Sequence, residues 1–79
     1  MATKEKLITE THVPLEITLT FRQEQILTMI LKGMTNYQIA KRLDLSESTV
    51  KMHIGLILKK YQVQHRTQLI LSHNMNNKF

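Results

Sequence analysis

Apolar residues recur every three to four positions through most of the chain after residue 20. This spacing places them on one side of an α-helix. The pattern predicts four helices, over residues 21–32, 36–43, 47–61 and 64–73. Their apolar stripes comprise Ile26, Leu27, Ile30 and Leu31; Ile39, Ala40 and Leu43; Val50, Ile54, Ile57, Leu58 and Tyr61; and Leu69, Ile70 and Leu71. The sequence therefore predicts an all-α fold.

Polar residues just before these segments mark where the helices begin. Thr20 with Gln23, and Thr35 with Gln38, fit the capping box, in which a hydroxyl and a side chain three residues later each bind a backbone amide. Ser46 is a cap candidate for the third helix, with apolar residues on both sides of it at staple spacing. The starts of the first three helices are thus marked locally.

The link between the second and third predicted helices is short enough to fix their arrangement. Only residues 44–46 separate them, so the link can form nothing longer than a tight turn. Two short helices joined in this way are typical of a helix-turn-helix. Pro14 and the lack of a sustained helical period indicate an N-terminal arm or linker over residues 1–18. We expect a compact four-helix domain over 19–74 and a C-terminal tail over 75–79.

The charge of the chain is positive and concentrated in its second part. The 79 residues carry a formal net charge of +5, and residues 19–79 hold nine Lys or Arg against three acidic residues. A small basic domain favours an anionic partner, of which nucleic acid is the commonest. A basic surface that serves only solubility is the alternative.

Other kinds of chemistry find little support in the sequence. The absence of cysteine excludes disulfides and thiolate metal sites and fits a reducing cytoplasm. No apolar run is long enough for a signal peptide or a membrane span. The four histidines lack metal-ligand spacing, and no strained nucleophile turn is present. We expect no metal, no cofactor and no enzymatic activity.

Three stretches resemble one protein family. "LTFRQEQIL", "GMTNYQIAKRLDLSESTVKMHI" and "LKKYQVQHRTQ" are similar to the pattern of the LuxR-type (FixJ/NarL-type) helix-turn-helix domain, over residues 19 to about 71. The resemblance implies that helix 47–61 enters the major groove of DNA. It also implies that the last helix, or its surroundings, supports dimer contacts.

The third predicted helix carries a second stripe, opposite its apolar one. A helical period places five residues on this face: Ser48, Lys51, Met52, Gly55 and Lys59. In a major groove, Lys51 could bind guanine O6 and N7, and Met52 could contact a thymine methyl group. Members of the family often read bases from the positions of Lys51, Met52 and Gly55, so the glycine removes one possible contact. We expect few direct base contacts and rather degenerate recognition.

Contacts to phosphate position a protein on DNA without specifying sequence. Our candidates are Thr35, Asn36, Thr49, Lys59, Lys60 and Arg66. Each has another explanation within the fold. Thr35 is a cap, Thr49 could bond to the local backbone, and a lysine near a helix C-terminus favours the helix dipole. Arg66 matches a family position but could instead pair with an acidic group inside the fold.

Several residues depart from the family pattern. Gln23 and Gln25 replace the usual acidic pair, which alters salt links and reduces repulsion of phosphate. Leu56 stands where Asn is frequent, and Gln62 where Gly is frequent. The change at Gln62 costs little unless the turn needs a positive φ.

Together these observations predict sequence-specific binding of double-stranded DNA by a bacterial transcriptional regulator, or by its output domain, acting as a homodimer. The alternative is a protein-interaction module that contacts another regulator or RNA polymerase through Leu56 or the apolar residues 69–71. The basic stripe separates the two functions, because a module that binds only protein does not need it.

Overall fold

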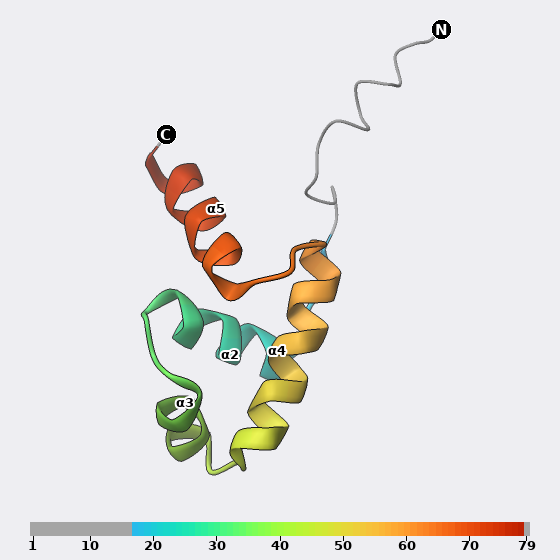
Figure 1. Ribbon diagram of the computed structural model, residues 1–79, viewed down its shortest axis with the longest axis vertical. Helices are drawn as coiled ribbons and strands as arrows, with labels where there is room; N and C mark the ends of the chain where they lie inside the picture. Colours follow the sequence, from blue (N-terminus) through green and yellow to red (C-terminus); the bar gives the residue numbers. More distant parts are fainter. Residues whose placement is uncertain (1–16, 79) are drawn as a thin grey trace, which may run out of the picture.

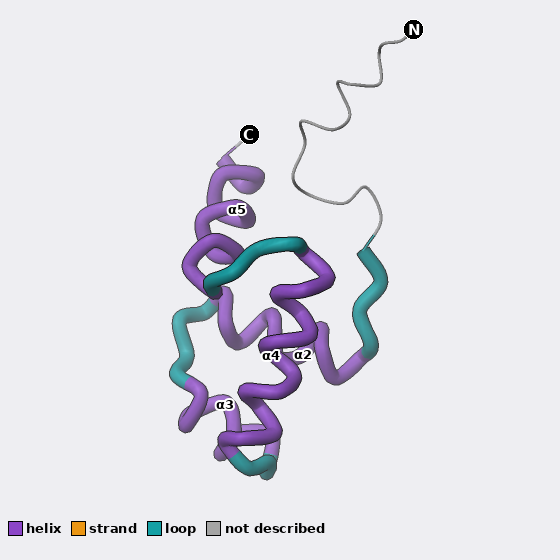
Figure 2. Tube along the Cα trace, turned by 45° about the vertical axis from the view of Figure 1, so that its right-hand side comes forward, coloured by secondary structure: helices purple, strands orange, loops and turns teal. Residues whose placement is uncertain are grey.

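The computed structural model of the protein describes residues 17–78, and the side chains among them up to residue 74. Within this range the chain forms four helices: α2 (Phe21–Leu31), α3 (Asn36–Leu43), α4 (Glu47–Tyr61) and α5 (Arg66–Lys78). No strand occurs among the described residues (Figure 2). The predicted all-α class is confirmed. The N-terminal arm predicted over residues 1–18 lies almost entirely outside the described residues.

The predicted helix starts are formed by the predicted caps. Thr20 Oγ1 accepts from the Gln23 amide at 3.1 Å, and Gln23 Oε1 accepts from the Thr20 amide at 3.0 Å. The same reciprocal pair joins Thr35 and Gln38, at 3.1 and 2.9 Å. Ser46 caps α4 by accepting from the amide of the third residue beyond it. Such caps satisfy amides that a helix leaves unpaired, and losing one typically costs about 1 kcal/mol.

A single core joins the four helices. In Figure 1, α3 lies beside the beginning of α4 and α5 lies towards its end, with α2 packed against both α4 and α5. Each helix contributes apolar side chains to the core, and six of them are essentially inaccessible: Ile26, Ile30, Ile39, Val50, Ile57 and Leu69. Burying a side chain of this size contributes roughly 1.5–3 kcal/mol relative to leaving it exposed. The core therefore holds α3 and α4 in one fixed arrangement, the predicted helix-turn-helix.

Three helices end at residues with positive φ. Gly33 after α2 has φ +83°. Asp44 after α3 and Gln62 after α4 have φ of 60° and 59°, and both are left-handed C-caps. Side chains with a Cβ adopt this conformation at a cost of roughly 1–2 kcal/mol. The turn at Gln62 thus needs the positive φ that glycine provides most easily. Glutamine in place of the glycine that is frequent here therefore lowers the stability of the fold.

The last helix differs most from its prediction. It begins at Arg66 rather than residue 64, because Gln68 Oε1 accepts from the amides of Gln64 and His65, both at 2.8 Å, and holds them ahead of the helix. It ends at Lys78, five residues beyond the predicted end at 73, and so runs into the segment expected to be a tail. No glycine or proline follows residue 55 to stop it.

Candidate nucleic-acid interface

The polar face of α4 points away from the core. Val50, Ile54 and Ile57 are buried on one side of the helix. The predicted stripe on the other side is exposed throughout and comprises Ser48, Lys51, Met52, Gly55 and Lys59, with Met52 55% accessible. The outward orientation of this stripe is confirmed, while its contact with DNA stays a prediction. We call these five residues the α4 stripe.

A hollow beside the stripe brings residues from three helices together. Lys51 and Gly55 of α4 line it with Asn36, the first residue of α3, and Arg66, the first residue of α5. The hollow has a volume of about 500 Å³, and Gln64 and His65 of the loop before α5 also line it. Four of the ten residues predicted from the sequence thus line one surface.

Gly55 lies on this surface without any steric need for glycine. It does not have a positive φ, and a Cβ built on it meets no atom within 4 Å. The fold would therefore accept a larger side chain here. The missing side chain leaves an opening at the centre of the α4 stripe.

The predicted hydroxyl residues are engaged in local hydrogen bonds. Thr35 caps α3. Thr49 Oγ1 accepts from Ser46 Oγ at 2.9 Å, so its local partner is a side chain rather than the backbone. The Ser48 hydroxyl lies 3.3 Å from the same Ser46 oxygen. A hydroxyl can both donate and accept, so each retains capacity for a further partner.

Lys60 is exposed, but its ammonium group forms hydrogen bonds within the fold. Its Nζ donates to the Thr18 carbonyl oxygen and to Gln23 Oε1, both at 2.8 Å. Gln23 is only 5% accessible and stands at the start of α2, so the ammonium ties the end of α4 to the start of α2. The salt-link change that we expected at Gln23 within the first helix is in fact a contact between helices. The position of Lys60 argues against a role in phosphate binding.

Arg66 is also engaged within the fold. Its Nη1 donates to Asn36 Oδ1, and its Nη2 donates to the Met34 carbonyl oxygen at 2.9 Å. An internal partner was one of the two alternatives from the sequence. Both acceptors, however, are neutral rather than acidic. Arg66 thereby joins the first turn of α5 to the start of α3.

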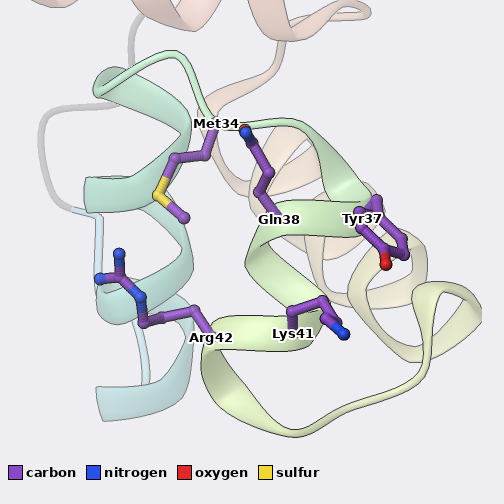
Figure 3. A pocket seen from close by; sticks show the side chains of 5 residues that line it. All are labelled: Met34, Tyr37, Gln38, Lys41 and Arg42. Atoms are coloured by element: carbon purple, nitrogen blue, oxygen red, sulfur yellow. The ribbon is translucent and has the colours of Figure 1, made fainter.

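Tyr37 and Lys41 form an exposed aromatic and basic pair on α3 that was not among the residues predicted from the sequence. The Lys41 ammonium lies 5.6 Å from the centre of the Tyr37 ring, within cation–π distance. Both side chains are exposed, Tyr37 by 57%. Figure 3 shows them pointing to the side of α3 on which α4 lies, whereas Arg42 and Met34 point towards α2. The signal in the sequence was an exposed aromatic four residues before a lysine on the first helix of the motif.

Two ionisable groups lie outside the α4 stripe. Burial raises the pKa of Tyr61 above its ordinary value of 10.0, and the charge of Glu24 raises it further. The ring of Tyr61 lies 5.7 Å from that of His73. His53 is half-buried on α4, and its Nδ1 is enclosed without a hydrogen-bond partner.

Among the residues that the structure describes, no group of three or more His, Cys, Asp or Glu could hold a metal ion. No helix within 17–78 has the length and apolar character needed to cross a membrane.

Comparisons with a family model and with individual relatives all point to the same protein family. The model of the family described as bacterial regulatory proteins, luxR family, matches residues 17–73. The chain is 46% identical over 50 residues, 63% of its length, to the nitrate/nitrite response regulator protein NarL of Escherichia coli K12. It is 42% identical over 60 residues, 72% of its length, to the response regulator protein VraR of Staphylococcus aureus.

A solved structure matches the fold as well. The response regulator ChrA of a heme-sensing two-component system is similar over 95% of this chain, with a TM-score of 0.68 and 31% identity. The matched regions make up 23% of NarL, 29% of VraR and 37% of the ChrA chain. The chain therefore spans less than two fifths of the length of these relatives.

Proposed function

This chain belongs to the luxR family of bacterial regulatory proteins, and on that premise we propose that it binds double-stranded DNA as the DNA-binding unit of a transcription regulator. The observation that carries the proposal is the α4 stripe, an exposed face with two lysines on a helix fixed by a buried core. A helix of this kind fits the major groove, which is about 12 Å wide. The unit comprises residues 19–74, and the chemistry that it needs is binding, with no catalytic step.

The residues divide into two roles. We propose Lys51 and Met52, which are both exposed, for contacts with base edges, and Gly55 leaves an opening between them and Lys59. Thr35, Asn36, Ser48, Thr49 and Lys59 are the groups that we propose for phosphate, and Lys41 with Tyr37 joins them from α3. We leave out Lys60, because its ammonium already has two acceptors. Recognition should therefore rest on few base contacts.

The homodimer expected on DNA is part of the same proposal. Leu71 on α5 is 60% exposed and offers an apolar side chain on a helix other than α4. Contact with RNA polymerase or another regulator, through this residue or through Leu56, is the other use of such a surface. Leu69, which we expected to share this surface, is 1% exposed and belongs to the core instead. A palindromic binding site would favour the dimer, because half-site symmetry mirrors protein symmetry.

The salt dependence of DNA binding tests the proposal. The affinity for a labelled duplex should fall with salt concentration, with a log–log slope of about −0.9 for each phosphate that the protein neutralises. Lys51→Ala should weaken binding to a selected site by ~1–3 kcal/mol and binding to random duplex by less. Lys32→Ala is the matched control, because it removes the same charge from the end of α2, away from the α4 stripe. Absent or salt-insensitive binding would favour the protein-interaction alternative.

A further inference from the structure

The hydrogen bond from Arg66 to Asn36 fixes which way the side-chain amide of Asn36 faces. Among the described residues that line the hollow, no other hydrogen bond fixes a side-chain amide in this way. Arginine has donors and no acceptor, so the group that faces it must be the Asn36 oxygen. The Asn36 NH₂ group, with its two donors, must then point away from Arg66. Asn36 lines the same hollow as Lys51 and Gly55. Its donors are thereby held at the edge of the proposed DNA surface.

The second hydrogen bond of Arg66 makes this arrangement rigid. Nη2 donates to the Met34 carbonyl oxygen at 2.9 Å, just before the Thr35 cap of α3. A planar guanidinium that is fixed at two points cannot turn without losing one of them. The residue is half-buried, and its position at the start of α5 sets where the fork lies. Each fold contact uses one N–H of a different terminal nitrogen, so the guanidinium cannot turn its end-on fork to a phosphate without losing both contacts.

We propose that Arg66 is a positioning residue for DNA binding: it holds Asn36 so that the side-chain NH₂ donates to a DNA phosphate, and it links this contact to α5. The inference rests on the proposed function. It differs from the expectation for Arg66 drawn from the sequence, because the arginine itself does not touch DNA. Movement of α5 against α3 would displace the Asn36 donors and weaken binding without altering the α4 stripe.

Arg66→Lys separates positioning from direct contact, since it keeps the charge but loses the rigid planar fork that holds Asn36 and the Met34 carbonyl in a fixed geometry. We would measure the affinity of the full chain for a labelled random-sequence duplex at several salt concentrations, for wild type, Arg66→Lys, Asn36→Ala and the double variant. Losing one hydrogen bond to a charged group predicts about a tenfold weaker complex for each single variant. The double variant should be no weaker than either single one, and the salt slope should not change, because Asn36 is neutral.

Asn36→Asp provides a second test that does not rely on disturbing Arg66. The new carboxylate should accept more strongly from Arg66 and lie at a helix N-terminus, so thermal stability should rise. DNA binding should nevertheless weaken, because the phosphate now meets an anion. Gln25→Glu is the matched control, with the same change in net charge on α2. A residue with a purely structural role would not show a gain in stability together with a loss of binding.

The outcomes are distinct. Arg66→Lys that binds like wild type, or losses that multiply in the double variant, would overturn the inference while leaving the proposed function in place. Asn36→Asp that binds as well as Gln25→Glu would overturn it too. A wild-type chain that does not bind duplex at all would remove the proposed function, and this inference with it.

Discussion

Replacing Gly55 by alanine should stabilise the protein. Glycine in a helix interior costs about 1 kcal/mol relative to alanine, because more backbone entropy is lost on folding. Gly55 is exposed in α4, and an added Cβ would meet no atom within 4 Å, so no steric term offsets the gain. A stabilisation of about 1 kcal/mol in a domain of this size corresponds to a rise in Tm of roughly 4–8 °C.

Thermal unfolding followed by circular dichroism measures this change. Gly33→Ala is the control with the opposite sign: it has the same open surroundings but a φ of +83°, so alanine there should lower the Tm. Gly55→Ala without a higher Tm would refute the helix-propensity argument. Gly55→Lys extends the test to function, because a cation at the centre of the α4 stripe should steepen the salt slope of duplex binding by about 0.9. An unchanged slope would contradict the placement of this face against DNA.

Three further predictions concern other parts of the molecule. Gln62→Gly should raise the free energy of unfolding by about 1 kcal/mol in chemical denaturation, because Gln62 has a φ of 59°; no gain would mean that the left-handed cap carries no strain. Lys41→Ala should reduce the salt slope of duplex binding by about 0.9, whereas Tyr37→Phe, which keeps the aromatic face, should leave the slope unchanged. Because the pKa of Tyr61 is raised in the folded state, the unfolded chain loses its proton first as pH rises above 10. Stability should therefore be intact below pH 10 and fall as pH rises through the raised pKa; in Tm measurements Tyr61→Phe should flatten this fall, and Tyr37→Phe should not.

Signals close together in the sequence predicted most of the fold. α3 and α4 have the bounds that were predicted, because their caps lie within three residues of the groups they bind. α5 lacked such a signal. Its start depends on Gln68, which binds two amides from inside the helix rather than from a cap position. Its extent to Lys78 has no residue that marks an end.

The roles of individual basic residues were harder to predict, because their partners are distant in the chain. Lys60 binds acceptors 42 and 37 positions away, and Arg66 binds acceptors 30 and 32 positions away. Composition counts each of them as one positive charge available to an anion. Only the fold distinguishes them from Lys51 and Lys59, which protrude from a regular helix on the side opposite its apolar residues. The α4 stripe was predictable because helical periodicity alone determines it.

If the chain binds DNA as proposed, the charge of Lys60 should still affect that binding, although the residue is absent from the proposed interface. Its acceptors are a carbonyl oxygen and the amide of Gln23, so hydrogen bonding satisfies the ammonium without neutralising it. A glutamate at position 23, as is usual in the pattern that this chain resembles, would form an ion pair there and cancel one positive charge. Uncancelled charge adds to the long-range field that draws an anionic duplex towards the protein, even from residues that do not touch it. The substitution at Gln23 thus keeps the tie between α2 and α4 and leaves the field of the domain more positive. Under the proposed function, this effect would act on the rate of association, where salt screens it, and base recognition would rest on the residues proposed for it, Lys51 and Met52.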